Sequence, residues 1–441
     1  MSGRSVEDLD LQPGASPGRT QPFYGWRLLA VFWLVLFVNL AFPMTGGSLL
    51  VTAMARSLEF DREQLGLPFA VYFGVIGIAS PLVAALILRF GVRATLAIGN
   101  AALAVGALLL ATVVTDPLLA TIFFGVLIGF AVSAGGNLTT QTAIPRWFIR
   151  HRARAFAIIL TASAAGGVIV TPLLGWIIGP TGAEWRSGWW LLAGLATAIV
   201  IVILVAVREY PADVGQFPDG DSSPTQSSGS KAKLDGAGMS DSWSAVLATK
   251  MFWVIAFGSF ALTAALSLFL AHGAANAADQ GYSQTEIAFI LAGYALIGFL
   301  AKIVIAVYGD RWNPAYMWAI LFVFSAAALG VAAIDLSGAG IYVYMAFAGI
   351  GLGGGLVCPP ATAARHFEGP MFARATSGFF LLQSIAGVST PLVAGAWFNA
   401  SGSYFGAFIL TALLCVASAL VLVATAGRRR AAIESRMANS G

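Results

Sequence analysis

Lys302 stands in a stretch of sequence where a charged side chain is unusual. Between Ile287 and Gly309 it is the single charge in an otherwise apolar run. About 20 such residues, at about 1.5 Å each, cross the ~30 Å hydrocarbon core of a bilayer, so the run predicts a membrane-spanning helix. A lysine there costs about 2.5–3.5 kcal/mol on insertion scales and usually faces the bundle interior, where it meets a partner or a ligand. No other span expected below has a Lys, Arg, Asp or Glu well inside it.

Two orientations of Lys302 are open from the sequence. It precedes Asp310 by eight residues, about 12 Å along a helix, so its long stem could bring the ammonium toward the membrane surface. Against this, Tyr294, Gly298, Lys302 and Ala306 recur every fourth residue and share one sector of the helix. A lipid-facing sector would be large and aliphatic, whereas this one is mostly small or polar. The pattern favours a lysine that faces a cavity and binds a ligand.

Several amide side chains interrupt other apolar stretches. Asn39, Asn137, Gln141 and Gln383, the last followed by Ser384, are the ones that could contact the same ligand. Asn137 and Gln141 are four residues apart and therefore share a helix face. Buried amides must find hydrogen-bond partners, which can be neighbouring helices as well as a ligand. The two interpretations are balanced for Asn39 and Gln141, and packing is favoured for Asn137.

The histidines and cysteines narrow the chemistry. His151, His272 and His366 are scattered, and Cys358 and Cys415 lie in apolar segments. These residues form no disulfide framework, metal set or acid–base cluster, so we expect no enzyme, no metal and no cofactor. His272 ends an apolar stretch before a short polar loop. It is the most plausible proton carrier where spans lack acids, although a hydrated histidine at a helix end is an equal alternative.

Composition places the chain in a membrane. It has 441 residues, of which 58% are hydrophobic and only 10% charged, with a mean hydropathy of +0.83. A soluble domain cannot bury that much apolar surface, so we expect a polytopic membrane protein in contact with the lipid bilayer. The net charge of +4 is better explained by topology than by nucleic-acid binding. Residues 1–22 are polar and lack the apolar segment of a cleavable signal peptide.

The pattern predicts an all-α membrane protein with twelve transmembrane helices in two six-helix bundles. The expected spans are 26–50, 66–88, 93–115, 117–142, 154–179, 188–208, 251–273, 286–309, 315–334, 340–362, 374–398 and 403–426. The expected domains are an N-terminal tail (1–22), a first bundle (23–208), a solvated Ser/Gly/Asp/Pro-rich linker (209–249), a second bundle (250–427) and a C-terminal tail (428–441).

Basic residues predict the orientation. With the N-terminus inside, the 24 Lys and Arg divide into 20 cytoplasmic, three outside (Arg56, Arg62 and Arg186) and one within the membrane, Lys302. Such a bias supports an even number of spans with both termini cytoplasmic. The arginine clusters are therefore explained first by membrane topology.

The two halves repeat at an offset of 219 residues. The matching segments are Arg146-Trp147-Phe148 with Arg365-His366-Phe367, Gly135-Gly136 with Gly354-Gly355, and Thr171-Pro172-Leu173 with Thr390-Pro391-Leu392. Each match falls on corresponding spans, the fourth and fifth against the tenth and eleventh. Parallel repeats of six helices are typical of transporters that rock around a site near the membrane midplane.

Residues 22–427 resemble the major facilitator superfamily. The segment Arg89-Phe90-Gly91-Val92-Arg93 is similar to the superfamily's G-x-x-x-D-R-x-G-R loop motif, with Leu88 in place of its Asp and Ala84 in place of its first Gly. The second half keeps Asp310-Arg311 in the equivalent loop. The resemblance implies the major facilitator fold, and a cytoplasmic gate at Arg89, Gly91, Arg93, Asp310 and Arg311.

More narrowly, the chain resembles the bacterial monocarboxylate porter and oxalate–formate antiporter branch. The similar segments are Tyr24-Gly25-Trp26 and the run Trp147-Phe148-Ile149-Arg150-His151-Arg152-Ala153-Arg154-Ala155-Phe156-Ala157. The resemblance implies that the cation on the eighth helix, Lys302, binds the substrate carboxylate. Phe42-Pro43 is followed by Met44 where proton-coupled relatives have a lysine. Gln383 is neutral where dicarboxylate carriers have a second cation.

The sequence thus predicts a monomeric secondary transporter of a small organic monoanion in the bacterial inner membrane, with proton-coupled uptake by alternating access. Lys302, Tyr294, Asn39, Gln141 and Gln383 would bind the substrate. The alternative is a carrier, importer or exporter, of a larger neutral or amphipathic compound such as a vitamin or a drug.

Overall fold

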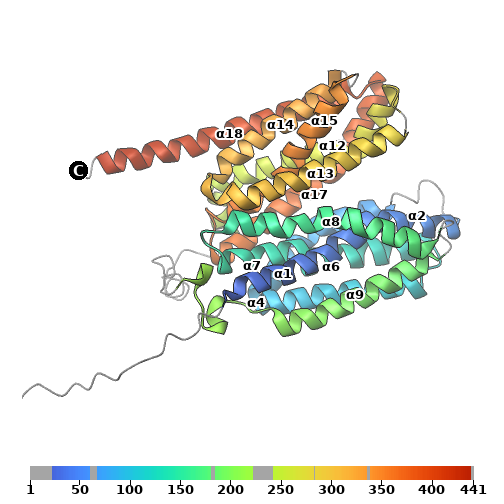
Figure 1. The fold of residues 1–441 in the computed structure, drawn as a ribbon, viewed down its shortest axis with the longest axis horizontal. Helices are drawn as coiled ribbons and strands as arrows, with labels where there is room; N and C mark the ends of the chain where they lie inside the picture. The colour runs from blue at the N-terminus through green and yellow to red at the C-terminus, as the bar shows by residue number, and fades with distance from the viewer. Residues whose placement is uncertain are drawn as a thin grey trace, which may run out of the picture.

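The computed structural model of the chain describes residues 22–59, 67–179, 184–221, 242–282, 284–334 and 338–438. In these ranges the chain is helical and contains no strand. Figure 1 shows two bundles lying side by side, the first in blue to green and the second in yellow to red. The all-α fold with two bundles, expected from the hydrophobic runs, is confirmed.

The first bundle crosses the membrane six times in five helical segments, some of which contain π-helical turns. They are α1–η1–α2 (Tyr24–Leu36, Phe37–Gly46, Gly47–Ser57), α4 (Leu67–Thr112), α5–η2–α6–η3–α7 (Pro117–Ala120, Thr121–Ile128, Gly129–Val132, Ser133–Asn137, Leu138–Trp147), α8 (Arg152–Ile178) and α9 (Trp185–Ala206). The long α4 contains two spans, because Gly91 inside it has a left-handed φ of 84° and turns the chain back.

The second bundle repeats this arrangement. Its elements are α12 (Lys250–Asp279), α13 (Gln284–Tyr308) with η7 (Gly309–Arg311), α14 (Pro314–Ile334), α15–η8–α16 (Gly340–Ala348, Gly349–Gly353, Cys358–Ala363), α17 (Gly369–Ser401) and α18 (Phe405–Ala438). The last helix continues to Ala438, whereas the sequence predicted a tail from residue 428.

Ten helical segments of the described chain are long and apolar enough to cross a membrane. Because α4 supplies two spans at its bend, they account for eleven crossings. The twelfth is α8, whose 27 residues reach about 40 Å at 1.5 Å per residue. Figure 1 shows α8 running the length of the first bundle beside the second. The chain is therefore a multi-pass membrane protein with the twelve helices that the sequence predicts.

The linker expected to be solvated is partly folded. Its first part forms two short 3-10 turns, η4 (Pro211–Val214) and η5 (Pro218–Gly220), and its last part forms α11 (Trp243–Ala248). Gln216 accepts a hydrogen bond from the backbone N–H of Tyr24, at 2.8 Å, so η4 is joined to the start of α1. Residues 222–241 and the tail before residue 22 lie outside the described residues.

Glycines in corresponding segments of the two bundles permit close helix packing. A Cβ on Gly99 would lie 2.0 Å from the backbone nitrogen of Gly135 in η3, and one on Gly351 in η8 would lie 2.5 Å from the nitrogen of Ser325. Only glycine allows backbones to approach this closely, as is common where membrane helices pack through small residues. The glycine-rich repeats therefore join neighbouring helices in each bundle.

The bundles touch each other along two seams, α8 against α13 and the first part of α4 against α17. We call the end of the bundles where α1 begins and α9 ends the basic end, because Arg89, Arg146, Arg208 and Arg365 lie there. Hydrogen bonds between described residues of the two bundles come from Ser80, His151, Arg152 and Arg154. None of these lies near the opposite end, so the bundles are joined from the basic end toward the middle.

Candidate functional site

Lys302 lies on the side of α13 that faces away from the surrounding lipid. Its side chain is 4% exposed, whereas the opposite side of the helix presents large aliphatic residues. These exposed residues are Leu296, Leu300, Ile303, Val304 and Val307. The alternation follows directly from the helical period, since Lys302 is half a turn away from the lipid-facing stripe. The ammonium therefore belongs to the protein interior.

The surroundings of Lys302 contain few charges. Among the described residues, no carboxylate forms an ion pair with it and no hydrogen bond satisfies its ammonium. On neighbouring turns of α13, Gly298 packs on Gly353 of η8, and the Ala306 carbonyl accepts a hydrogen bond of 2.9 Å from Arg154 Nε on α8. Lys302 thus lies on a helix of the seam, between a turn that packs within its own bundle and a turn that contacts the other bundle, with two turns of helix between it and Asp310.

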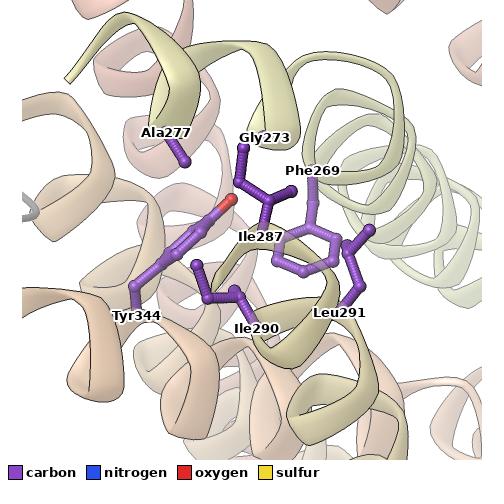
Figure 2. A pocket seen from close by; sticks show the side chains of 7 residues that line it. All are labelled: Phe269, Gly273, Ala277, Ile287, Ile290, Leu291 and Tyr344. Atoms are coloured by element: carbon purple, nitrogen blue, oxygen red, sulfur yellow. The ribbon is translucent and has the colours of Figure 1, made fainter. Parts of the chain in front are cut away.

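Tyr294 lies two turns from Lys302, toward the opposite end of the bundle. Its ring centroid is 4.4 Å from that of Phe269 on α12, which in turn contacts Tyr344 on α15. Beside these rings is a small apolar pocket, drawn in Figure 2 and lined by Phe269, Gly273, Ala277, Ile287, Ile290, Leu291 and Tyr344. The Tyr344 hydroxyl is buried there without a hydrogen-bond partner among the described residues. This pocket suits an apolar group and offers no counter-charge.

Asn39 is part of a polar contact inside the first bundle. Its amide nitrogen donates to Asn100 Oδ1 at 2.8 Å and to the Val35 carbonyl at 3.0 Å. Asn100 in turn donates to the Gly135 carbonyl at 2.9 Å, so the contact joins three helices. Both asparagines are fully buried. In this conformation the Asn39 amide nitrogen holds neighbouring helices together through hydrogen bonds. This agrees with the packing interpretation of Asn39 and leaves ligand binding as a proposal.

The other predicted amides differ from one another. Gln141 is 4% exposed and donates to Asn137 Oδ1 at 2.6 Å, in keeping with their expected common face. Gln383 on α17 is half-buried and has no hydrogen-bond partner among the described residues. No hydrogen bond in the described chain links Lys302 directly to either glutamine. Gln383 is therefore the predicted amide with no protein hydrogen bond in the described chain, although the Asn39 Oδ1 also lacks a partner there.

His272, the predicted proton carrier, lies near the end of α12. Its Nε2 is 3.0 Å from the carbonyl oxygen of Pro391 on α17, and its ring is 5.0 Å from that of Tyr404. A carbonyl only accepts, so Nε2 carries the proton in this contact. The histidine is half-buried between helices of the second bundle.

The first predicted gate loop is held by a residue that the sequence did not single out. Glu209, directly after α9, accepts hydrogen bonds from the backbone N–H groups of Val92 and Arg93 at 3.1 and 2.8 Å. It also pairs with Arg146 at 2.8 Å. Gly91 is required beside it, because a Cβ there would lie 2.6 Å from the Glu209 carboxylate. Glu209 supplies an acid to a loop whose usual Asp is replaced by Leu88.

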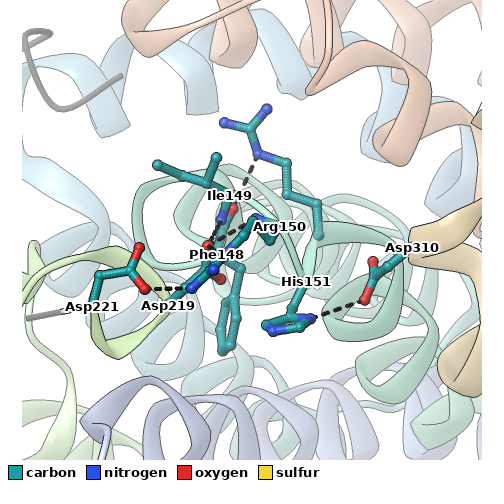
Figure 3. A network of polar contacts seen from close by, with 8 residues as sticks. Phe148, Ile149, Arg150, His151, Asp219, Asp221 and Asp310 are labelled. Carbon is teal, nitrogen blue, oxygen red and sulfur yellow. Dashed lines mark hydrogen bonds and ion pairs between the residues drawn. The ribbon is translucent and has the colours of Figure 1, made fainter. Parts of the chain in front are cut away.

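Asp310 makes two of the contacts that join the bundles at the basic end. Its carboxylate accepts from the Arg154 backbone N–H at 3.1 Å and lies 3.2 Å from His151 Nδ1, as Figure 3 shows for the histidine. The acid therefore sits at the N-terminus of α8, where the helix dipole favours negative charge. Arg89 and Arg311 are exposed and stack on Phe90 and Tyr308 instead of crossing between bundles.

The residues that the sequence analysis missed have weak signals in the sequence. Glu209 and Asn100 pair with residues far away in the chain, and nothing in their local context predicts those partners. His151 was one of three scattered histidines, and Arg154 belonged to an arginine cluster explained first by topology. Both also lie in the run that resembles the branch signature, yet their contacts with Asp310 were not predicted. Asn100 had the clearest signal of the four in the sequence, since it is a polar residue inside an apolar span.

Comparisons with known proteins agree with this architecture. The family model of the Major Facilitator Superfamily matches residues 31–276 and 273–438. The chain is 23% identical over 416 residues to an uncharacterized MFS-type transporter, YcxA, of Bacillus subtilis (strain 168), covering 92% of this chain and 94% of that protein.

Two solved structures share the fold. FucP, an MFS transporter in its outward conformation, aligns with a TM-score of 0.68 at 14% identity, over 90% of this chain and 97% of that one. The proton:xylose symporter XylE, bound to 6-bromo-6-deoxy-D-glucose, aligns with a TM-score of 0.75 at 14% identity, over 90% and 94%. The matched family model spans nearly all of the described helices, and the chain belongs to the Major Facilitator Superfamily.

Proposed function

We propose that this chain is a secondary transporter of a small organic monoanion and that Lys302 binds the carboxylate. The supporting observation is a lysine that is 4% exposed at the seam between the bundles, with no acid paired to it among the described residues. A buried ammonium is costly unless a counter-charge or water accompanies it. A substrate carboxylate supplies that charge, and water supplies it when the site is empty.

The rest of the proposed site limits the charge of the substrate. Gln383, which has no hydrogen-bond partner among the described residues, can donate to a carboxylate or hydroxyl but adds no charge. Tyr294 is on the same side of α13 as Lys302, two turns away. One cation matches one negative charge, so a monocarboxylate is favoured over a dicarboxylate. Asn39 and Gln141 would join the site only if their contacts rearrange during transport.

The orientation of the charged ends supports a bacterial inner-membrane transporter with both termini in the cytoplasm. The basic end, which holds most of the arginines, is then cytoplasmic by the positive-inside rule. Because the bundles are joined at that end, the described conformation is closed toward the cytoplasm. The substrate would enter from the periplasm, and the bundles would rock to release it inside.

Proton coupling is the finer part of this proposal. No described acid lies well inside a span, Met44 replaces the lysine of coupled relatives, and His272 is the titratable group placed between helices that must move. A histidine changes charge near neutral pH and is suited to this role. We infer that His272 binds the coupled proton during uptake.

The second candidate is a transporter of a larger neutral or amphipathic compound. The apolar pocket beside Phe269 and Tyr344 favours it, since it would accept an uncharged group. In that case Lys302 would stabilise a contact between the bundles without binding the substrate. The two candidate functions differ in whether uptake depends on a negative charge on the substrate.

The test is uptake by the purified full chain in proteoliposomes. A panel of short carboxylates would be compared with neutral compounds, with and without an inward-acid pH gradient. We expect accumulation of a monocarboxylate by wild type, its loss in Lys302→Ala and partial activity in Lys302→Arg, which keeps the charge but has a larger, more directional head group. Lys250→Ala, which removes an exposed lysine at the start of α12, is the matched control. Wild-type uptake by well-folded Lys302→Ala would refute the proposal.

A further inference from the structure

A second pocket, which is polar, lies between the two bundles at the basic end, two helical turns along α13 from Lys302. The space within it that a water molecule can reach is about 40 Å³, and it is lined by residues of both bundles. The charged residues of its lining are Arg150 and Arg152 from the first bundle, and Asp310 and Arg365 from the second. Three guanidinium groups and one carboxylate thus share a cavity that exists only while the bundles are together.

The acids around this pocket already have protein partners, although one oxygen of Asp219 is buried without a hydrogen bond among the described residues. Both oxygens of Asp310 are occupied by His151 and the Arg154 N–H. Asp219 binds the backbone N–H groups of residues 149 and 150, as Figure 3 shows, and Asp221 pairs with Arg150 on its exposed side. Glu368, which attracts Arg152, is exposed. Arg150 is therefore paired on its exposed side, and Glu368 and Asp219 partly offset the charge of Arg152. Arg152 and Arg365 are the two pocket arginines that no acid pairs by an ion pair among the described residues.

Those two cations, Arg152 and Arg365, repel each other across the pocket. Arg152 donates Nε to the Phe148 carbonyl and one terminal nitrogen to the Ala364 carbonyl of the other bundle. Arg365 donates one terminal nitrogen to the Trp312 carbonyl at 3.2 Å. Their remaining N–H groups have no partner among the described residues. Burial lowers the pKa of Arg365, although Asp310 opposes this change.

Guanidinium groups with free donors at one pocket are suited to binding phosphate and similar oxyanions, because the planar fork matches two oxygens at once. We propose that this pocket binds a small phosphate-like oxyanion that bridges Arg152 of the first bundle and Arg365 of the second. The anion relieves the repulsion between the two arginines and so stabilises the conformation closed at the basic end. The Lys302 site is separate, and this inference holds whatever substrate Lys302 binds.

Bound oxyanion therefore acts as a regulator of transport. With the basic end in the cytoplasm, a phosphate-rich cytoplasm favours the outward-open state. The bound anion slows the opening of the basic end, because it must leave before the two bundles separate there. A ligand that binds only one of two states shifts the equilibrium toward that state in proportion to its occupancy. The phosphate group can belong to a free solute or to an anionic lipid head group.

The experiment measures thermal unfolding of the purified full chain in detergent, at constant ionic strength, with sodium phosphate replacing sodium chloride. A parallel arm uses nanodiscs of phosphatidylglycerol or phosphatidylcholine. We expect a saturable rise in Tm with phosphate in the wild type. Arg365→Gln should raise the apparent Kd for phosphate about tenfold or more, since it removes a charge-assisted hydrogen bond. Arg365→Lys should retain part of the effect.

Arg208→Gln is the matched control, because Arg208 is another basic-end arginine bound to backbone carbonyls but outside the pocket. Arg152→Gln, from the other bundle, provides a second test of the bridge. An Arg365-dependent shift with phosphatidylglycerol alone assigns the phosphate to lipid, and one with inorganic phosphate assigns it to a solute. The proposal is overturned if neither arm shows a saturable shift, or if Arg208→Gln loses the shift as fully as Arg365→Gln.

Discussion

Asp310→Ala tests whether the contact at the basic end sets the balance between the two transport states. The carboxylate accepts the Arg154 N–H at 3.1 Å and contacts His151 at 3.2 Å, and both partners belong to the other bundle. These contacts exist only while the basic end is closed. Removing them should therefore favour separation of the bundles at that end without disturbing either bundle itself.

The size of the effect follows from these two contacts. A hydrogen bond to a charged group contributes about 1.5–3 kcal/mol. The His151 side chain is 38% exposed, so its ion pair contributes less, about 0–1 kcal/mol. We expect about 2 kcal/mol in total, or about a 30-fold change in the equilibrium constant between states. A minor state populated at about 3% would then become about equal to the major one.

The assay is a distance measurement by electron paramagnetic resonance between spin labels at the opposite end. Thr115→Cys and Asn399→Cys place labels on exposed residues, one in each bundle, while the native Cys358 and Cys415 are buried. Asp310→Ala should move population toward shorter distances between these labels, because closing the opposite end accompanies opening of the basic end.

Asp213→Ala is the matched control for this experiment. Asp213 also accepts two backbone N–H groups, from Glu209 at 3.1 Å and Tyr210 at 3.0 Å, but both lie in its own half of the protein. This control should leave the distance distribution unchanged. A distribution for Asp310→Ala identical to that of wild type would refute the role of Asp310 in holding the bundles together.

Three further predictions concern stability, coupling and topology. Asn100→Leu should lower the free energy of unfolding by about 1–3 kcal/mol, because it removes the buried hydrogen bonds that Asn100 makes to Asn39 and to the Gly135 carbonyl, and an unchanged thermal midpoint would contradict that packing role. His272→Gln should abolish the acceleration of uptake by external acid while preserving substrate exchange, and retained acceleration would exclude His272 as the proton carrier. A reporter fused after residue 225 should be cytoplasmic and one near Ser401 periplasmic, whereas the reverse would overturn the proposed orientation.

The features that depend on the periodic pattern of the chain could be predicted from its sequence. Hydrophobic runs and the 219-residue repeat predict the twelve helices, because membrane length and backbone hydrogen bonding leave few alternatives. The four-residue stripe through Lys302 likewise predicts that it faces the interior, as its 4% exposure bears out. Each of these follows from local geometry along a single helix.

The contacts that join distant segments could not be predicted in the same way. Asn39 pairs with Asn100 over 61 residues, Val92 with Glu209 over 117, and Arg154 with Asp310 over 156. Such pairs depend on how helices pack, and an isolated sequence contains no signal for them. The same limit explains why residues 209–221 were expected to be solvated, although Glu209 is bound to the first bundle.

The most direct test of the Lys302 site compares an acid with its own amide. The best monocarboxylate from the uptake panel and its primary amide have nearly the same shape, so a difference in their affinity measures recognition of the charge. Wild type should bind the acid about tenfold to a hundredfold more tightly than the amide, as expected for charge-assisted hydrogen bonding. In Lys302→Ala that preference should disappear while the protein remains folded. A preference for the acid that is unchanged in Lys302→Ala would show that another group binds the carboxylate.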